Sequence, residues 1–282
     1  MKRVLILGAS SMIGHQLFKY LNLKNIKVYG TSRNQKKSPN LYYFDPVKNL
    51  NFINTIIKKI KPNCIINTIG IIKHRKQIND FKNTIFLNSI LPHEIAKISN
   101  RNKIKFIHLS TDCVFSGKKG NYSETDIPDA KDMYGISKKL GEINYKNCLT
   151  LRTSFIGYEL NNKTGLFEWV LNYKNKKIDG FSNAFYNGFT TLELSKIIYK
   201  LIQSNIPIEG LYNLSSKKIS KYKLLCLIIN CFNLPIKVVK KATFFCDRTL
   251  NSRKFFKKIE YKVPNWDKMI LDMRNLENDF YK

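Results

Sequence analysis

The chain has 282 residues, 43% of them hydrophobic and 12% aromatic, so it is long enough to bury a substantial core. Its formal net charge is +29, but the lysines are dispersed in short clusters with no arginine-rich tract or nucleic-acid motif. A general bias toward Lys, Asn and Ile accounts for this charge, and we expect no nucleic-acid partner. The six cysteines form no C-x-x-C pair and no cluster with histidine, which argues against a metal site or a disulfide framework.

Apolar runs in this chain are short. None approaches the roughly 18 residues of a membrane span, and the first one, Val4 to Leu7, ends at Gly8, too early for the core of a signal peptide. We therefore expect a cytoplasmic protein with no membrane partner. A basic surface of this kind would attract a doubly charged nucleotide substrate.

The first half alternates short apolar runs with segments of helical periodicity, a pattern typical of a parallel sheet covered by helices. The runs expected to be strands are 4–7, 26–29, 41–44, 64–67, 106–109 and 149–151. Between them, the apolar residues at 13, 17, 18 and 21, and those at 50, 53, 56, 57 and 60, share one helical face. We predict an α/β fold, a Rossmann-like doubly wound parallel sheet.

After about residue 153 this alternation becomes irregular. Helices are expected at 166–173, 192–203, 221–231 and 266–278, with short strands at 211–214 and 236–239. This pattern predicts a smaller C-terminal α+β lobe that closes over the carboxyl edge of the sheet, where ligands of such folds bind. We expect residues 1–153 to form a Rossmann-like dinucleotide-binding domain with the catalytic residues, and residues 154–282 to form mainly a substrate-binding lobe.

A glycine-marked turn follows the first predicted strand and opens an amphipathic helix. Free N–H groups and the positive end of the helix dipole would face a cofactor pyrophosphate there. The predicted cofactor contacts in this turn are Gly8, Ser10, Ser11, Met12, Ile13 and Gly14. Ser11 stands where a middle glycine is often found, so its hydroxyl either crowds the phosphate or hydrogen-bonds to it. The alternative is a plain tight turn between a strand and a helix.

The end of the second strand distinguishes the two nicotinamide cofactors. An acidic residue there would bind a ribose 2′-hydroxyl, whereas an arginine accommodates a 2′-phosphate. The chain has Ser32 and Arg33 at this point, with Lys36 and Lys37 beyond them. We expect both Ser32 and Arg33 to contact the cofactor, and NADPH is favoured. NADH stays an alternative, because a lysine-rich loop can be basic by composition alone.

Two later segments are also expected to contact the cofactor. Asp45 follows the third strand, where it would contact the adenine, although a turn residue before Pro46 is an equal alternative. Thr68, Ile69 and Gly70 follow the fourth strand and should run beside the nicotinamide.

Tyr134 and Lys138 have the spacing of neighbours on one helical face. A lysine charge near the phenol favours the phenolate and lowers its pKa, so the pair would act as a general acid and base. Tyr20 with Lys24 has the same spacing. What distinguishes Tyr134 is Thr111, upstream at the end of a predicted buried strand.

Several linked motifs resemble the extended short-chain dehydrogenase/reductases, and within them the dTDP-4-dehydrorhamnose reductase-like branch. The motifs are Leu109 to Gly117, Tyr122-x-Glu124, Tyr134-Gly-x-Ser-Lys138-x-x-Gly141-Glu142 and Leu151 to Ser154. The resemblance implies hydride transfer from NADPH to the C4 ketone of a nucleotide-linked 4-keto-6-deoxy sugar, in deoxysugar or surface polysaccharide biosynthesis.

The resemblance also implies residue roles. Tyr134 would donate the proton to the carbonyl oxygen. Lys138 would tune the pKa of the Tyr134 phenol and bind the nicotinamide ribose. Thr111 would hydrogen-bond the substrate oxygen. The predicted substrate contacts are Ser110, Thr111, Asp112, Tyr134 and Phe155. Asn88 matches a position near the active site, and a buried structural hydrogen bond is the alternative for it.

Two departures from that branch leave the sugar open. Cys113 replaces the usual tyrosine after Asp112, and the segment 67–73 replaces an alanine-rich and acidic stretch. A UDP-linked 2-acetamido sugar is therefore an alternative substrate. A 4,6-dehydratase is disfavoured because related dehydratases place Glu where Cys113 stands.

Other functions and the oligomeric state also stay open. An epimerase would use the same tyrosine and lysine. A non-catalytic nucleotide-binding regulatory subunit is a further alternative, against which the presence of Thr111, Tyr134 and Lys138 together argues. A homodimer is left open.

Overall fold

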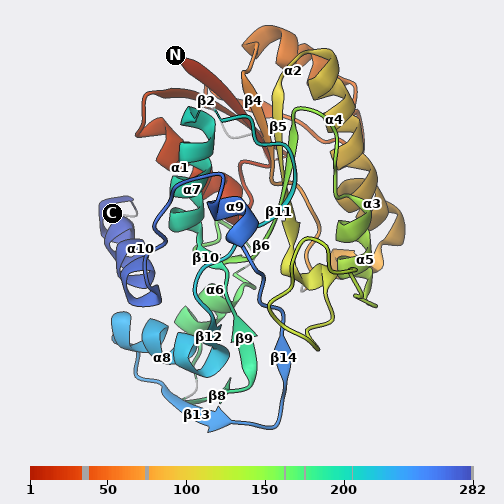
Figure 1. The fold of residues 1–282 in the computed structure, drawn as a ribbon. Coiled ribbons are helices and arrows are strands. Elements are labelled where there is room, and N and C mark those ends of the chain that lie inside the picture. Colours follow the sequence, from red (N-terminus) through yellow and green to blue (C-terminus); the bar gives the residue numbers. More distant parts are fainter. Residues whose placement is uncertain (34–37, 74–75, 162, 175, 205, 281–282) are drawn as a thin grey trace.

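A seven-stranded parallel sheet forms the centre of the molecule (Figure 1). The computed structural model describes residues 1–33, 38–73, 76–161, 163–174, 176–204 and 206–280. The strands of the sheet are β1 (Lys2–Leu7), β2 (Ile26–Ser32), β3 (Leu41–Tyr43), β4 (Cys64–Asn67), β5 (Lys105–Thr111), β6 (Cys148–Thr153) and β11 (Gly210–Asn213). Their order is β11-β6-β5-β4-β1-β2-β3, and every neighbouring pair is parallel. All carboxyl ends therefore meet at one edge, where a ligand site is expected.

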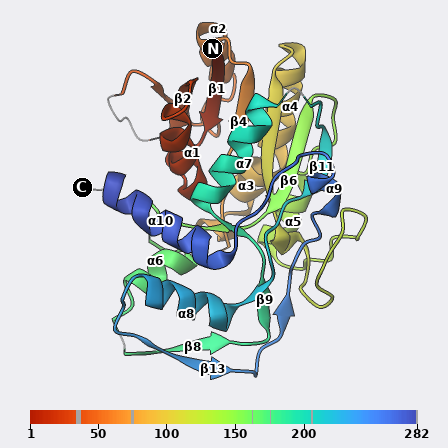
Figure 2. The same cartoon turned by 60° about the vertical axis from the view of Figure 1, so that its left-hand side comes forward.

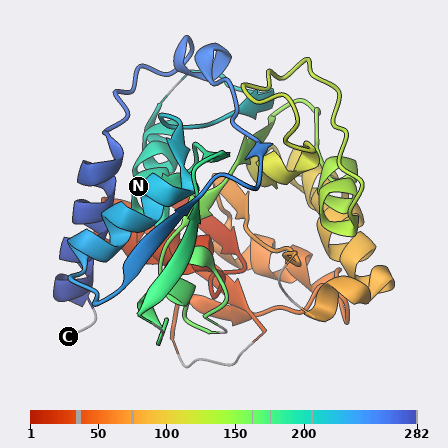
Figure 3. The same cartoon turned by 90° about the horizontal axis from the view of Figure 1, so that it is seen from below.

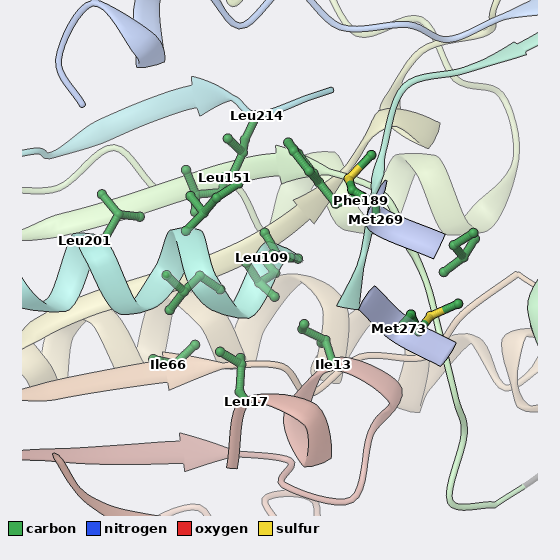
Figure 4. Packing of buried hydrophobic residues seen from close by; sticks show 14 of the residues in the cluster. Ile13, Leu17, Ile66, Leu109, Leu151, Phe189, Leu201, Leu214, Met269 and Met273 are labelled. Atoms are coloured by element: carbon green, nitrogen blue, oxygen red, sulfur yellow. The ribbon is translucent and has the colours of Figure 1, made fainter. Parts of the chain in front are cut away.

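Helices cover both faces of this sheet, as the continuous apolar strands require. Val4 and Ile6 of β1 belong to the hydrophobic cluster that includes the buried faces of α1 (Met12–Asn22) and α7 (Thr191–Gln203). Leu5 and Leu7 belong to the cluster of α2 (Phe52–Ile60) and α4 (Leu91–Arg101) on the other face. Figure 2 shows α1 and α7 side by side, and Figure 4 shows Leu17 and Leu201 of these helices within their cluster.

Short helical segments lie near the carboxyl edge of the sheet. They are η1 (Lys76–Asn79), α3 (Phe81–Ile85), the π-helical turn η2 (Phe86–Ile90), the 3₁₀ turn η3 (Asp112–Val114) and α5 (Met133–Leu140). The chain runs from α3 through η2 into α4 without a break. A π turn within a helix is often found at a functional site.

The smaller lobe lies below the carboxyl edge of the sheet in the view of Figure 1, and Figure 3 shows its strands in front of the sheet. Its strands are β7 (Phe155–Ile156), β8 (Lys177–Phe181), β9 (Ala184–Tyr186), β10 (Phe189–Thr190), β12 (Ile219–Ser220), β13 (Lys237–Lys241) and β14 (Cys246–Asp247). Its helices are α6 (Leu166–Leu171), α8 (Lys221–Cys231) and α10 (Trp266–Phe280), whereas α9 (Arg253–Phe256) packs against β11 of the main sheet. The predicted fold, a Rossmann-like parallel sheet with a smaller C-terminal α+β part, is confirmed.

One strand lies elsewhere than the sequence suggested. The strand expected at 211–214 is present as β11, but it pairs with β6 in the main sheet rather than within the lobe. The preceding helix α7 also packs against α1. The chain thus returns to the sheet after residue 153, because β11 extends the parallel ladder beyond β6. The predicted division of roles at residue 153 stays a prediction.

Within the described ranges, no helix has both the length and the apolar composition needed to cross a membrane.

Candidate active site

The first turn between strand and helix depends on two glycines. Gly8 has a φ of +83°, in the left-handed region that residues with a Cβ rarely adopt. A Cβ on Gly14 would overlap the carbonyl oxygen of Gly8 and crowd the side chains of Ser11 and Thr68. The backbone can therefore turn directly from β1 into α1, which brings the amino terminus of α1 to the carboxyl edge of the sheet.

The hydroxyl of Ser11 caps α1. It accepts a hydrogen bond from the Gly14 amide at 3.0 Å and donates one to the Thr68 hydroxyl at 2.9 Å. Thr68 in turn donates to the carbonyl oxygens of Leu7 and Gly8, at 2.8 and 3.0 Å. A serine hydroxyl has only one proton to donate, and here that proton is already used. This arrangement disfavours the predicted hydrogen bond from Ser11 to a phosphate.

The amino terminus of α1 fits a dinucleotide pyrophosphate. The side chain of Ser11 satisfies the Gly14 amide, whereas the amides of Met12 and Ile13 have no hydrogen-bond acceptor in the part of the chain that the structure describes. Such unpaired amides at the positive end of a helix are suited to an anion. The predicted contacts Gly8, Ser10, Ser11, Met12, Ile13 and Gly14 are all in or beside this turn.

Ser32 and Arg33 lie at the end of β2, beside this turn. Ser32 is buried and its hydroxyl donates to that of Ser10 at 3.4 Å, while Arg33 is exposed. Lys36 and Lys37 lie outside the described residues. Asp45 accepts a hydrogen bond from the Val47 amide at 3.1 Å and so stabilises a turn. Its contact with adenine stays a prediction.

The segment after β4 packs onto the glycine turn. A Cβ on Gly8 would contact Thr68 and Ile69. Behind this segment, the buried Asn67 accepts from the Ile69 amide at 3.1 Å and bonds the imidazole of His108 at 3.2 Å. These bonds fix the path of residues 68–70, which are predicted to run beside the nicotinamide.

Asn88, in the π turn, is a structural residue. Its side chain is fully buried, bonds both the amide and the carbonyl of Ile71 and donates to the Ser137 hydroxyl at 3.0 Å. A Cβ on Gly141 would collide with the Asn88 carbonyl oxygen. Asn88 therefore joins the segment after β4 to α5, which matches the structural alternative for this residue.

Thr111, Tyr134 and Lys138 come together at the carboxyl end of β5. The Thr111 hydroxyl accepts from the Cys113 amide at 3.1 Å and donates to the Asp112 carboxylate at 3.2 Å. It also lies close enough to the phenol of Tyr134 to lower the pKa of that group. Asp132 caps α5 by accepting from the Gly135 amide at 3.0 Å, which sets where the helix and its tyrosine begin. The structure thus brings the three predicted catalytic residues into one site.

The pKa of Tyr134 differs from the prediction. Burial raises the pKa of the phenol and the neighbouring Cys113 raises it further, while the interaction with Thr111 acts against both. Burial has the largest influence and Lys138 is not among the groups that shift this pKa most, so the net lowering expected from the lysine is not found. At neutral pH the phenol keeps its proton, which suits a group that donates a proton to a carbonyl oxygen.

Lys138 is buried, with 5% of its surface exposed, and donates to the Leu109 carbonyl at 2.7 Å. Burial lowers its pKa to about 8, and the charge of Glu142 acts against that shift. The amine is therefore still largely protonated at neutral pH and loses its charge at moderately alkaline pH.

A buried ion pair stands behind this site. Arg152 donates to both carboxylate oxygens of Glu142 at 2.7 Å, and Ser110 donates to the same carboxylate at 2.8 Å. The guanidinium also lies 5.1 Å from the ring centroid of Phe115. The hydroxyl of Ser110 is thus already engaged with Glu142, and its predicted contact with substrate stays a prediction.

Asp112, Cys113 and Phe155 surround the site on the side of the lobe. Burial raises the pKa of the Asp112 carboxyl, although the charges of Arg248 and Lys221 oppose this. Burial also raises the pKa of the Cys113 thiol to about 12, so it stays uncharged and cannot act as the acid-base group of a dehydratase. Phe155, on β7, is partly buried against the larger core cluster.

Three residues near the site were not identified from the sequence: Tyr186, Lys221 and Arg248. They come from β9, α8 and the segment after β14, and they reach Asp112 only through the fold of the lobe. No local motif precedes any of them. Lys221 in particular is one lysine among many, so nothing in the sequence marks it.

The described part of the chain has no cluster of three or more His, Cys, Asp or Glu side chains suited to a metal ion.

The sheet, its glycine turn and the Tyr134–Lys138 pair define the extended short-chain dehydrogenase/reductase fold. A model of the RmlD substrate binding domain matches residues 1–273, and the chain belongs to this family.

Individual relatives are distant. A dTDP-4-dehydrorhamnose reductase of Aggregatibacter actinomycetemcomitans is 28% identical, over 77% of this chain and 74% of the relative. The methionine adenosyltransferase 2 subunit beta of Xenopus laevis is 24% identical, over 86% of this chain and 75% of that protein. The crystal structure of a Bacillus anthracis dTDP-4-dehydrorhamnose reductase in complex with NADP superposes with a TM-score of 0.82 at 21% identity, covering 98% of this chain and all of the other. At that identity the likeness concerns the fold.

Proposed function

We propose that this protein is an NADPH-dependent reductase of the C4 ketone of a nucleotide-linked 4-keto-6-deoxy sugar. The observation that supports this most is the convergence of Thr111, a protonated Tyr134 and a buried Lys138 at the sheet edge, beside a helix terminus with unpaired amides. The name of the Aggregatibacter relative agrees with this reaction. In this proposal residues 1–153 hold the cofactor and residues 154–282 mainly hold the substrate.

NADPH, when bound, would supply the hydride. Met12 and Ile13 would bind its pyrophosphate through their amides, Arg33 would bind its 2′-phosphate, and Lys138 would bind the nicotinamide ribose. Residues 68–70 would run beside the nicotinamide.

Tyr134 acts as the general acid in this proposal. The phenol would hydrogen-bond the carbonyl oxygen and give its proton as negative charge develops there. The Thr111 hydroxyl, which donates to Asp112 in this structure, would have to rotate its proton toward the same oxygen to take part. The raised pKa of Tyr134 keeps the proton on the phenol until negative charge develops on the carbonyl oxygen. The protonated Lys138 would stabilise the resulting phenolate, which recovers a proton from solvent.

Purified protein incubated with NADPH and a panel of 4-keto nucleotide sugars tests the proposal. The panel needs both dTDP-linked 6-deoxyhexuloses and UDP-linked 2-acetamido sugars, because Cys113 and the segment 67–73 leave that choice open. We expect loss of NADPH absorbance with at least one of them. Binding of NADPH without turnover of any sugar would contradict the proposal.

The second relative is named as a subunit of a methionine adenosyltransferase, which agrees with the alternative of a non-catalytic regulatory subunit. In that case the protein would bind nucleotide without consuming NADPH. The same assay separates the two functions.

A further inference from the structure

The buried carboxylate of Glu142 and the buried ammonium of Lys138 contact β5 at successive residues. Lys138 donates to the carbonyl oxygen of Leu109 at 2.7 Å, and Glu142 accepts from the hydroxyl of the next residue, Ser110, at 2.8 Å. The same carboxylate accepts two hydrogen bonds of 2.7 Å from Arg152 on β6. The acid therefore lies behind Lys138, where it joins two strands of the sheet.

The turn that carries Glu142 is fixed by the packing of α5. The amide of Gly141 donates to the Lys138 carbonyl at 3.2 Å, and the amide of Glu142 donates to the Lys139 carbonyl at 3.1 Å. A Cβ on Gly141 would overlap the carbonyl oxygen of Asn88 in η2. Because α5 ends against η2 in this way, Glu142 reaches the sheet from the same turn of chain as Lys138.

The titratable groups around Lys138 come from three elements. Burial lowers the pKa of Lys138, and the charge of Glu142 acts against this shift. Tyr134, on the same helix, keeps its proton. On β5, burial and the charge of Lys138 lower the pKa of His108, so its imidazole stays neutral. On β6, Arg152 is bound to Glu142. In the described part of the chain, Glu142 is thus the carboxylate whose charge stabilises the protonated Lys138.

A structural role alone does not account for a charged group in this place. Buried ion pairs are often no more stabilising than apolar residues of the same volume, so an uncharged pair would join α5 to the sheet equally well. The ammonium of Lys138 gives the charge a second purpose. In the proposed reaction Lys138 has to stay protonated, because it stabilises the phenolate that Tyr134 becomes.

We propose that Glu142 is a positioning residue of the reaction, which holds the ammonium of Lys138 at the end of β5 and compensates its charge. This inference rests on the proposed function. Glu142 acts through Lys138 and contacts neither the substrate nor the cofactor.

An NMR titration of protein labelled with ¹³C at the lysine Cε tests the inference without any turnover. The Lys138 signal is identified by its absence from Lys138→Met, and in the wild type it should titrate near pH 8. Glu142→Gln should lower this pKa by about one pH unit, the order expected when one charge several Å away is lost from a protein interior. Glu94→Gln, an exposed glutamate on α4, is the matched control and should leave the pKa unchanged.

Two further variants separate the charge of Glu142 from its structural role. The double variant Glu142→Gln/Arg152→Gln leaves no unpaired buried charge, so it should stay folded, yet the pKa of Lys138 should still be lowered. Arg152→Gln alone removes the opposite charge and should not lower this pKa. A wild-type pKa of Lys138 in both Glu142→Gln and the double variant would overturn the inference.

Turnover of a 4-keto nucleotide sugar gives the second readout. In the double variant, the rate should begin to fall at a pH lower than in the wild type, by the same amount as the pKa of Lys138. A loss of activity that is equal at every pH would indicate a structural role only and would also overturn the inference. A lowered pKa in the variants of a protein that reduces none of the sugars would contradict the proposed function instead, because the NMR titration does not depend on turnover.

Discussion

The polar groups on the two sides of the candidate site differ in how many of their hydrogen-bond and ion-pair partners the protein itself supplies. On the side of β1, Ser11 and Thr68 use their hydroxyl protons within the turn, and at the end of β5 the Glu142 carboxylate accepts hydrogen bonds from Arg152 and Ser110. On the side of the lobe, no carboxylate of the described residues lies within ion-pair distance of Lys221 or Arg248.

This difference indicates different tasks for the two regions. Internal hydrogen bonds hold the first side, which includes Thr111, Tyr134 and Lys138, in a rigid frame whose proposed ligand-binding groups are the amides of Met12 and Ile13 and a few side chains. The lobe instead presents two cations whose interaction with Asp112 is electrostatic, without a direct ion pair. The frame fits a cofactor common to many enzymes, whereas the lobe fits the particular substrate.

The largest effect that this comparison predicts is on turnover. Tyr134→Phe removes one hydroxyl from the frame and little volume, so it should reduce kcat by about 10² to 10⁴-fold while NADPH binding is retained. Steady-state rates and fluorescence titration of NADPH measure the two quantities. Tyr20→Phe, a tyrosine with the same spacing to a lysine, should leave both unchanged. A Tyr134→Phe rate within a few-fold of the wild type would remove Tyr134 from the mechanism.

The rigidity of the frame is tested at its buried ion pair. Glu142→Gln leaves the Arg152 charge buried without its partner and should lower the free energy of unfolding by about 3 to 5 kcal/mol. Urea denaturation measures this change. Glu94→Gln breaks an exposed pair with Lys97 and should cost less than about 1 kcal/mol. Equal losses in the two variants would show that the pair does not stiffen the frame.

Lys138 should be a functional residue that destabilises the fold. Its pKa is about 8 in the folded protein and near 10.4 in the unfolded chain. The unfolded state therefore binds more protons between these values, and stability rises with pH there. Below pH 8 the folded protein bears the full free-energy cost of burying the protonated amine. Lys138→Met should therefore raise the free energy of unfolding by about 1 to 3 kcal/mol. The same change should abolish activity.

The gain in unfolding free energy of Lys138→Met over the wild type should shrink as the pH approaches 10. Thermal unfolding measured across a pH series follows this change. Lys139→Met, an exposed neighbour, is the control and should show no such trend. The wild-type rate should also fall as the pH rises above about 8, because the amine then loses its charge. A gain independent of pH would argue against the lowered pKa of Lys138.

The smallest effect concerns the cofactor. Arg33→Ala should raise KM for NADPH about tenfold and leave KM for NADH nearly unchanged, since only NADPH has the 2′-phosphate. Arg101→Ala, an exposed arginine at the end of α4, should change neither. Equal increases for both cofactors would show that Arg33 is merely part of the basic surface.

The frame could be predicted from sequence because its parts are local. The glycine turn, the strand ending at Thr111 and the Tyr134–Lys138 spacing each lie within one short segment whose periodicity indicates its structure. The smaller lobe was also predicted as an α+β part, but its charged residues near the site could not be predicted in this way. Lys221 and Arg248 are far apart in sequence and reach Asp112 through tertiary packing. The raised pKa of Tyr134 was missed for a related reason: spacing shows a neighbouring charge but not the depth of burial.

Deuterium transfer is the most direct test of the central claim, a net reduction at sugar C4. The protein is given a 4-keto nucleotide sugar and NADPH with deuterium at the transferable C4 position of the nicotinamide, and the product is analysed by NMR and mass spectrometry. We predict deuterium at C4 of the sugar and one NADPH oxidised per sugar converted. A product formed without deuterium and with NADPH unchanged would instead indicate an epimerase and contradict the reductase proposal.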